Sequence, residues 1–452
     1  GSLPFCFKRP FVGLLMFTVL AYMRIQDMAW GFARYQRWSF YVALITFAGY
    51  FVAKDKKLPI LDARTVIMVL LAAAIGLGLF FARGEAPVDP TRYVEYVKII
   101  AISIFTTAVV RSREQLRILV WVIAMCFAFY GVKAGVSGIV KLGNVYIKRG
   151  PGGMIEDNND FALALAMSVP LLFHLGTSER NPILRKGVFG MIPLTMITVV
   201  LTRSRGGTLA MGMMVMVLVW RSRNRLLGFT IAGLAACAVF ALAPKEYKAR
   251  IASIKDYEQE GSAAGRLKAW AVAGRMISDN PLTGVGFRRF QMNYLQYEPN
   301  PSAEQVAGEG TIVAHNSYLQ IWAECGTPAF LMYISLILLS LLDIWRVRKE
   351  ARRRYHASWI LSYCTMFEAM LATFMLGSVF LNRAHFDLIY HYVAIILVFG
   401  KVAREEMSNE LAYPVRRTGT RSPLVTIETG GFGRRPQPIA GFRNTSLAPR
   451  RA

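Results

Sequence analysis

The residues best suited to chemistry lie in one polar interval of an otherwise apolar chain, residues 244–315. Arginine, glycine, histidine and aromatic residues gather there in three segments, 265–270, 280–287 and 314–318. Arginine offers forked donors that match phosphate oxygens, and histidine can take a proton near neutral pH. This combination favours a reaction on a phosphorylated substrate, with the apolar remainder of the chain as its scaffold.

Three residues are the expected catalytic groups: Arg205, Arg266 and His315. Arg205 lies with Arg203 in a short segment between two apolar runs, where Gly206 and Gly207 permit close backbone approach to an anion. The alternative for both arginines is snorkelling to lipid phosphate, and for Arg266 it is an ordinary surface position. A lone histidine is usually structural, but the place of His315 beside these arginines favours a general base.

Further substrate-binding residues are expected beside these three: Arg203, Arg288, Arg289 and Asn316. Arg288 and Arg289 follow a Gly-x-Gly sequence, which phosphate sites and ordinary turns share. Residues 266–277 are predicted to form an amphipathic helix lying at the membrane surface. The stretch 383–387, with His385, is expected to complete the wall of the same cavity.

The positioning elements are predicted to be transmembrane helices. Of 452 residues, 54% are apolar, and they recur in runs of roughly 15–24 residues bounded by Arg and Lys. This pattern is typical of an all-α polytopic membrane protein. About twelve spans are predicted, near 10–23, 38–53, 65–82, 93–110, 116–140, 161–177, 187–201, 207–220, 226–243, 327–345, 359–380 and 386–400.

Charge sets the expected orientation. Lys and Arg cluster in loops near 54–64, 111–117, 180–186, 221–225 and 346–354, which are therefore expected to be cytoplasmic. The net charge of +25 follows from this topology, so we expect no nucleic-acid partner. Four parts are predicted: helices one to nine (1–243), a large helical periplasmic catalytic loop (244–326), helices ten to twelve (327–400) and a disordered basic cytoplasmic tail (401–452).

Other polar and reactive residues give weaker evidence of function. The five cysteines show no disulfide or metal-binding spacing, and no metal or cofactor is expected. Glu368 lies inside an apolar run, where either a structural partner or a catalytic role would account for it.

Five segments together resemble the O-antigen ligase and O-antigen polymerase superfamily: 156–162, 204–206, 265–270, 280–286 and 315–319. The stretch 382–387 resembles a subgroup of ligases associated with exosortase systems. The resemblance implies a GT-C glycosyltransferase in the bacterial inner membrane, with its active site on the periplasmic face. It implies a glycan donor linked to undecaprenyl pyrophosphate, membrane lipid around the protein, and the sugar core of lipid A as acceptor. By motif, Arg205 and Arg266 would hold the pyrophosphate and His315 would act on the acceptor.

Three other functions stay open beside the ligase. An O-antigen polymerase would transfer the glycan to a second lipid-linked glycan, and a protein ligase would transfer it to a polypeptide. A transporter of anionic substrates is the alternative from a different class. Transporters usually carry charges near the middle of the bilayer and show repeated halves. Here the charges lie at the outer rim and the sequence shows no such repeat, which favours the enzyme.

Overall fold

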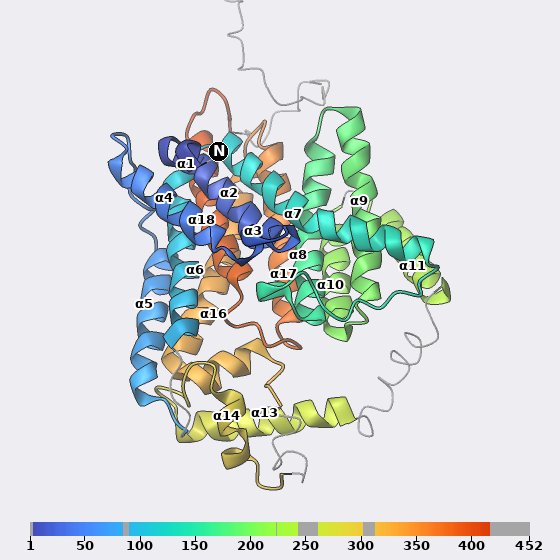
Figure 1. The fold of residues 1–452 in the computed structure, drawn as a ribbon. Helices are drawn as coiled ribbons and strands as arrows, with labels where there is room; N and C mark the ends of the chain where they lie inside the picture. The colour runs from blue at the N-terminus through green and yellow to red at the C-terminus, as the bar shows by residue number, and fades with distance from the viewer. Residues whose placement is uncertain (1–2, 85–89, 223, 243–260, 302–311, 416–452) are drawn as a thin grey trace, which may run out of the picture.

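The computed structural model describes residues 3–84, 90–222, 224–242, 261–301 and 312–415 (Figure 1). Helices dominate these residues; no strand is present among them, and their two β-bridges are isolated. The α-helices are α1 Leu3–Lys8, α2 Pro10–Tyr22, α3 Phe32–Tyr35, α4 Trp38–Val52, α5 Ala63–Gly78, α6 Pro90–Val109, α7 Arg113–Val140, α8 Asn158–Ser178, α9 Pro182–Leu201, α10 Arg205–Arg221, α11 Arg225–Leu242, α13 Gly261–Asp279, α14 Phe290–Tyr297, α16 Ser317–Ala351, α17 Ser358–Gly377 and α18 Asp387–Met407. Short 3-10 helices occupy Ile25–Met28, Leu79–Phe81 and Gly153–Ile155.

Each of the twelve predicted ranges falls on a helix, so the all-α prediction is confirmed. Within the described part of the chain, six helices are long and apolar enough to cross a membrane. They are Ala63–Phe81, Arg113–Val140, Asn158–Ser178, Pro182–Leu201, Ser317–Ala351 and Ser358–Gly377. The predicted count of about twelve spans is not confirmed by length and composition. One reason is visible in α6, whose first half carries Arg92, Glu95 and Lys98.

The centre of the bundle is α8. Most of its side chains are buried, because α7, α9, α10 and α17 all pack against it. A helix that is apolar on every side is expected in such a position. Its N-terminal end is the exception, since it carries Asp157, Asn158, Asn159 and Asp160. The central helix α8 therefore places polar groups at one end of the bundle.

Small residues let α7 and α9 approach closely. A Cβ atom added to Gly131 would lie 2.5 Å from Thr195 Oγ1, and one added to Gly135 would lie 2.4 Å from the carbonyl oxygen of Leu194. Thr198 also donates its hydroxyl to the carbonyl of Gly131 over 2.6 Å. This is the small-residue packing typical of helices within membranes.

Glu368 has a structural partner. It accepts hydrogen bonds from Arg221 Nε, at the end of α10, over 2.8 Å and from Arg348 Nη2, on α16, over 2.7 Å. The carboxylate thus joins α10, α16 and α17, which accounts for an acidic residue within an apolar run.

The predicted helix at 327–345 starts where the structure has a kink: Gly326 has non-helical backbone angles, so α16 consists of a shorter helical segment, 317–325, and the longer helix that follows Gly326. One predicted boundary is corrected. The predicted tail, from residue 401 onwards, begins inside α18, which continues to Met407. Tyr413 is buried beyond it and accepts a hydrogen bond from Trp359 Nε1 over 3.0 Å. The rest of the predicted tail, 416–452, lies outside the described residues, as do 243–260 and 302–311 of the predicted catalytic loop.

The described parts of that loop form a small helical layer. In Figure 1, α13 and α14 cross one end of the long helices, and the N-terminal residues of α1 lie at the other end. Residues 266–277 are helical as predicted, but their apolar face packs on protein. Its buried residues, at the spacing of one helix face, contact Phe290 and Tyr294 of α14 and Ala323 of α16; they are Ala269, Val272, Ala273 and Met276.

Candidate functional site

The end of the bundle beside α13 brings together the N-termini of α8 and α10 and the loop between α17 and α18. Ser204, the N-cap of α10, donates its hydroxyl to Asn159 Oδ1 of α8 over 2.7 Å. Gly206 lies against the loop, because a Cβ atom added there would be 3.2 Å from the Cβ atom of Phe380. Helix N-termini carry unpaired N–H groups and a positive dipole end, which favour anionic groups nearby.

The N-terminus of α16 joins the same place. The backbone N–H of Ser317 donates to the carbonyl of Ser378, and its hydroxyl accepts from the N–H of Arg383, each over 2.8 Å. Asn316 is the N-cap of this helix, and its side-chain oxygen accepts from two N–H groups of the first turn at 3.0 and 3.1 Å. Its amide oxygen therefore caps the helix, and a substrate contact of Asn316 stays a prediction.

His315 is held in an unusual backbone conformation immediately before this cap. Its φ is 45°, in the left-handed region that non-glycine residues seldom adopt. The preceding residue, Ala314, is buried, and its carbonyl accepts a hydrogen bond from Trp270 Nε1 of α13 over 2.9 Å. Trp270 and the cap of α16 therefore fix His315 from both sides.

Two charged residues act on the half-buried His315 ring. Burial lowers the pKa of His315, the positive charge of Arg266 lowers it further, and Asp157 opposes both. Arg266 comes from α13 and Asp157 is the N-cap of α8, so three separate segments meet here. The lowered pKa favours the neutral imidazole, which is the form that can accept a proton.

Arg205 and Arg203 lie on the α10 side of the site. Arg205 is the first residue of α10, directly after the Ser204 cap that binds α8. Arg203 has a φ of 55°, and its guanidinium lies 4.8 Å from the centre of the Tyr146 ring. Both side chains are half-buried. The structure thus places Arg205 on the same cluster of helix ends as Asp157.

Arg288 and Arg289 differ from each other. Arg289 is buried and donates to the carbonyl oxygens of Arg83 and Gly84, so its guanidinium anchors the chain after α5. Arg288 is exposed, with its guanidinium 5.9 Å from the centre of the Phe287 ring. Of these two expected substrate-binding residues, Arg288 is the one with an exposed side chain.

The Gly-x-Gly sequence before these arginines is a packing element. Gly284 has a φ of 66°, and a Cβ atom there would lie 2.4 Å from the carbonyl carbon of Glu324. The N–H groups of Val285 and Gly286 donate to the carbonyls of Ala323 and Glu324, each over 2.9 Å. The sequence left open whether Gly-x-Gly forms a phosphate site or an ordinary turn. In the structure it is a turn, and its N–H groups bind carbonyls of α16.

Two side-chain pairs near the site, one an ion pair and one a buried hydrogen bond, were not predicted. Arg383 pairs with Asp160 of α8, and burial lowers the pKa of Arg383 to about 10. His385 Nε2 lies 3.3 Å from Glu324 Oε2, and both side chains are 3% exposed. Burial lowers the pKa of His385, while Glu324 opposes the shift.

Of these four residues, the sequence singled out only Arg383 and His385 as part of the cavity wall. Residues 383–387 were expected to form a cavity wall, and this stays a prediction; in the structure Arg383 pairs with Asp160 and His385 with Glu324. Glu324 had the same signal as Glu368, an acidic residue in an apolar run. Asp160 belonged to a segment that was noticed only by resemblance.

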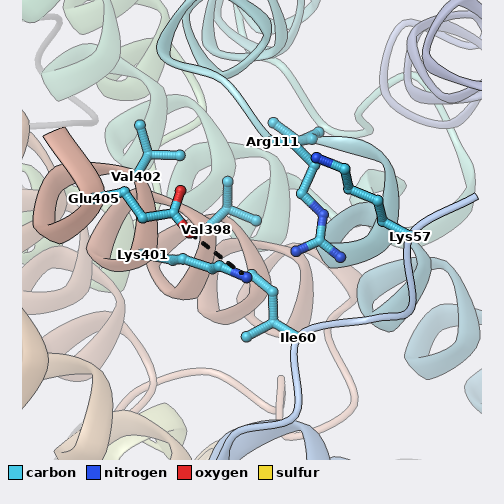
Figure 2. Close-up of a pocket in the computed structure, with 8 residues that line it drawn as sticks. Lys57, Ile60, Arg111, Val398, Lys401, Val402 and Glu405 are labelled. Carbon is cyan, nitrogen blue, oxygen red and sulfur yellow. Dashed lines mark ion pairs between the residues drawn. The ribbon is translucent and has the colours of Figure 1, made fainter. Parts of the chain in front are cut away.

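Two pockets in the described residues lie away from His315. One, between α13 and α14, is lined by residues that include Arg275, Asp279 and Tyr297. The other lies between the α4–α5 loop, the α6–α7 turn and α18, and is shown in Figure 2.

Comparison with protein families gives two matches. Residues 190–334 match a family model described as O-antigen ligase. Residues 2–175 match a model described as a family of unknown function (DUF5935). No curated protein matches the chain. The first match contains Arg205, Arg266 and His315, whereas Asp157 and Asp160 lie in the second.

Proposed function

We propose that this chain, which matches a family model described as O-antigen ligase over residues 190–334, transfers a glycan from undecaprenyl pyrophosphate to the sugar core of lipid A. The observation that carries the proposal is the meeting of Arg266, Asp157 and His315 beside the N-terminus of α10. Cationic and proton-accepting groups lie together at the end of apolar helices, where a lipid-linked pyrophosphate has its headgroup. The reaction would take place on the periplasmic face of the bacterial inner membrane.

In the proposed reaction, an acceptor hydroxyl attacks the anomeric carbon of the donor glycan. The new glycosidic C–O bond forms as the bond to the pyrophosphate oxygen breaks. The hydroxyl proton passes to the neutral ring of His315, and undecaprenyl pyrophosphate leaves with the electron pair. Asp157 stabilises the imidazolium that results, because its charge favours the protonated ring.

Arginines would supply the positive charge for the leaving group. Arg205 and Arg266 bind the pyrophosphate oxygens, and Arg203 and Arg288 contribute to the same field at longer range. Forked guanidinium donors fit phosphate oxygens, and fixed donors stabilise charge that develops in the transition state. We propose that no divalent metal takes part. Chelator treatment tests this, since loss of turnover that magnesium or manganese restores would contradict it.

The proposed reaction requires an architecture that gives a lipid-linked donor access to the site. About twelve spans with a GT-C-like arrangement would leave the described end of α8, α10 and α16 open to the lipid-linked donor. The layer of α13 and α14 would cover this end on the periplasmic side, with the large predicted loop as part of it. Membership of the exosortase-associated subgroup stays a prediction based on residues 382–387.

The identity of the acceptor is the decisive test. Purified full-length protein is mixed with radiolabelled lipid-linked glycan and offered lipid A–core, a second lipid-linked glycan or an acceptor peptide. We expect label on lipid A–core alone. Label on the second lipid-linked glycan would make the enzyme a polymerase, and label on the peptide would make it a protein ligase. Absence of any transfer, with donor binding intact, would contradict the glycosyltransferase proposal.

A further inference from the structure

A second polar site lies at the other end of the bundle, in the pocket of about 80 Å³ shown in Figure 2. Three segments line it: the loop between α4 and α5, the turn between α6 and α7, and α18. Lys401 of this pocket follows Asp387, the first residue of α18, by 14 positions, which is about 21 Å along a helix. The pocket is therefore separate from the His315 site.

The charge in this pocket is mainly positive. Lys57, Arg111 and Lys401 contribute three cations, and Glu405 contributes one carboxylate, 3.8 Å from Lys401 Nζ. Figure 2 shows the ends of the Arg111 and Lys401 side chains pointing into the same space, beside Ile60. The excess of two positive charges favours an anionic ligand over a cation or a neutral one.

Arg111 is held in place by the protein. Its guanidinium donates through Nε to the carbonyl of Ala108 over 3.1 Å and through Nη2 to the carbonyl of Leu58. Burial lowers the pKa of Arg111, because the charged form loses contact with water. A fixed and partly desolvated cation binds an anion more strongly than a mobile surface lysine does.

Apolar groups adjoin these charges. Ile60, Val110 and Val398 line the pocket beside the cations. On the loop that carries Lys57, Leu58 is 81% exposed and Leu61 is 89% exposed. These two leucines lie just before Ala63–Phe81, one of the helices suited to cross a membrane. Exposed leucines at this place are expected to contact acyl chains.

We propose that this pocket binds the phosphate headgroup of an anionic phospholipid. Lys57, Arg111 and Lys401 contact the phosphodiester, and the acyl chains extend along Leu58 and Leu61. The apolar groups favour a lipid over free phosphate, since free phosphate would gain nothing from them. The site does not depend on the proposed transfer reaction.

The test is native mass spectrometry of the full-length protein in detergent, titrated with phosphatidylglycerol, phosphatidylcholine or inorganic phosphate. Wild type should retain phosphatidylglycerol in preference to the other two. The double variant Lys57→Gln/Lys401→Gln should bind phosphatidylglycerol roughly thirtyfold more weakly, since each lysine near an anionic headgroup contributes about fivefold.

The matched control is Lys54→Gln/Lys56→Gln, which removes the same number of charges at two residues near Lys57 that do not line the pocket. It should bind phosphatidylglycerol as wild type does. An equal loss in both double variants would show attraction to general surface charge and overturn the site. Inorganic phosphate that binds as tightly as phosphatidylglycerol would overturn the lipid as its ligand. Both double variants leave the proposed catalytic residues unchanged.

Discussion

At the residue scale, the site depends on two opposite charges that act on one imidazole ring. Arg266 lowers the pKa of His315 and Asp157 raises it, on a ring whose pKa burial already lowers. The proposed chemistry requires that this ring be neutral before transfer. Transfer should therefore be lost only as the pH falls through a value below the ordinary histidine pKa of about 6.5.

Arg266→Gln should shift the fall in activity at acidic pH to higher pH values. Removing the cation eliminates one cause of the lowered pKa, so His315 becomes protonated, and inactive as a base, at a higher pH than in wild type. The measurement is kcat/KM for the donor against pH. Arg275→Gln, on the same helix but bound to the carbonyl of Tyr297, is the control and should leave the pH of this fall unchanged. If the pH at which kcat/KM falls is unchanged in both variants, a group other than His315 causes that fall.

Sequence alone led to His315 and Arg266 because residue type and neighbours already suggested proton transfer and anion binding. It did not lead to the partners of Arg383 and His385. Asp160 precedes Arg383 by 223 positions, and Glu324 precedes His385 by 61. Only the packing of α8 and α16 against one loop brings them together. Arg289 is the opposite case. Its residue type suggested anion binding, but in the structure its guanidinium is buried and donates to backbone carbonyls.

At the element scale, α13 positions the base through one hydrogen bond. Trp270→Phe keeps most of the apolar packing but removes the Nε1 donor from the buried Ala314 carbonyl. Leaving that acceptor unpaired should cost about 1–3 kcal/mol and loosen His315. We expect kcat to fall roughly tenfold, an effect of the size that a small misplacement of a catalytic group produces.

Trp322→Phe is the matched control for this variant. It removes an indole donor that binds Thr327 Oγ1 over 2.9 Å within α16, away from the Ala314 carbonyl. It should lower thermal stability with little change in kcat. Equal losses of kcat in the two variants would contradict a specific positioning role for Trp270.

The contact between Gly284 and α16 should tolerate little change. Gly284→Ala would place a Cβ atom 2.4 Å from backbone carbon at Glu324, in a residue with φ of 66°. We expect the folded protein to be destabilised by more than about 3 kcal/mol, or not recovered. Gly274→Ala, on α13, meets no atom within 4 Å and should be neutral or slightly stabilising. Thermal unfolding compares them, and equal melting temperatures would contradict this packing.

The helices were predictable because each apolar run is bounded by charge. The short helical segment before Gly326 was not. Gly326 and Pro328 are typical of the end of one segment and the start of the next, so the sequence predicted a helix from residue 327 only. In the structure, Gly326 has a φ of 80° and a non-helical backbone, and it separates that helix from the segment that begins at Ser317. The segment before Gly326 carries Ser317, Gln320 and Glu324, which is why the polar partners there were missed.

At the scale of the whole molecule, the two polar ends should face opposite sides of the membrane. Lys54 lies in the loop that also lines the cationic pocket, whereas Ser278 lies on α13 at the other end. In intact cells, a membrane-impermeant maleimide should label Ser278→Cys and not Lys54→Cys. Cys6, Cys126, Cys325 and Cys364 are buried, which limits background from these four. Labelling of Lys54→Cys alone would invert the topology and remove the periplasmic site.

The central claim is that His315 accepts the proton while arginines hold the donor. Its most direct test compares donor affinity and single-turnover transfer in wild type and His315→Ala, each shown to be folded. We predict that turnover falls by roughly 10²–10⁴-fold while donor affinity stays within a few-fold of wild type. His356→Ala, which removes an exposed histidine of similar backbone conformation from the turn between α16 and α17, should match wild type in both measurements. Near-normal turnover in His315→Ala would contradict the account and place the base elsewhere.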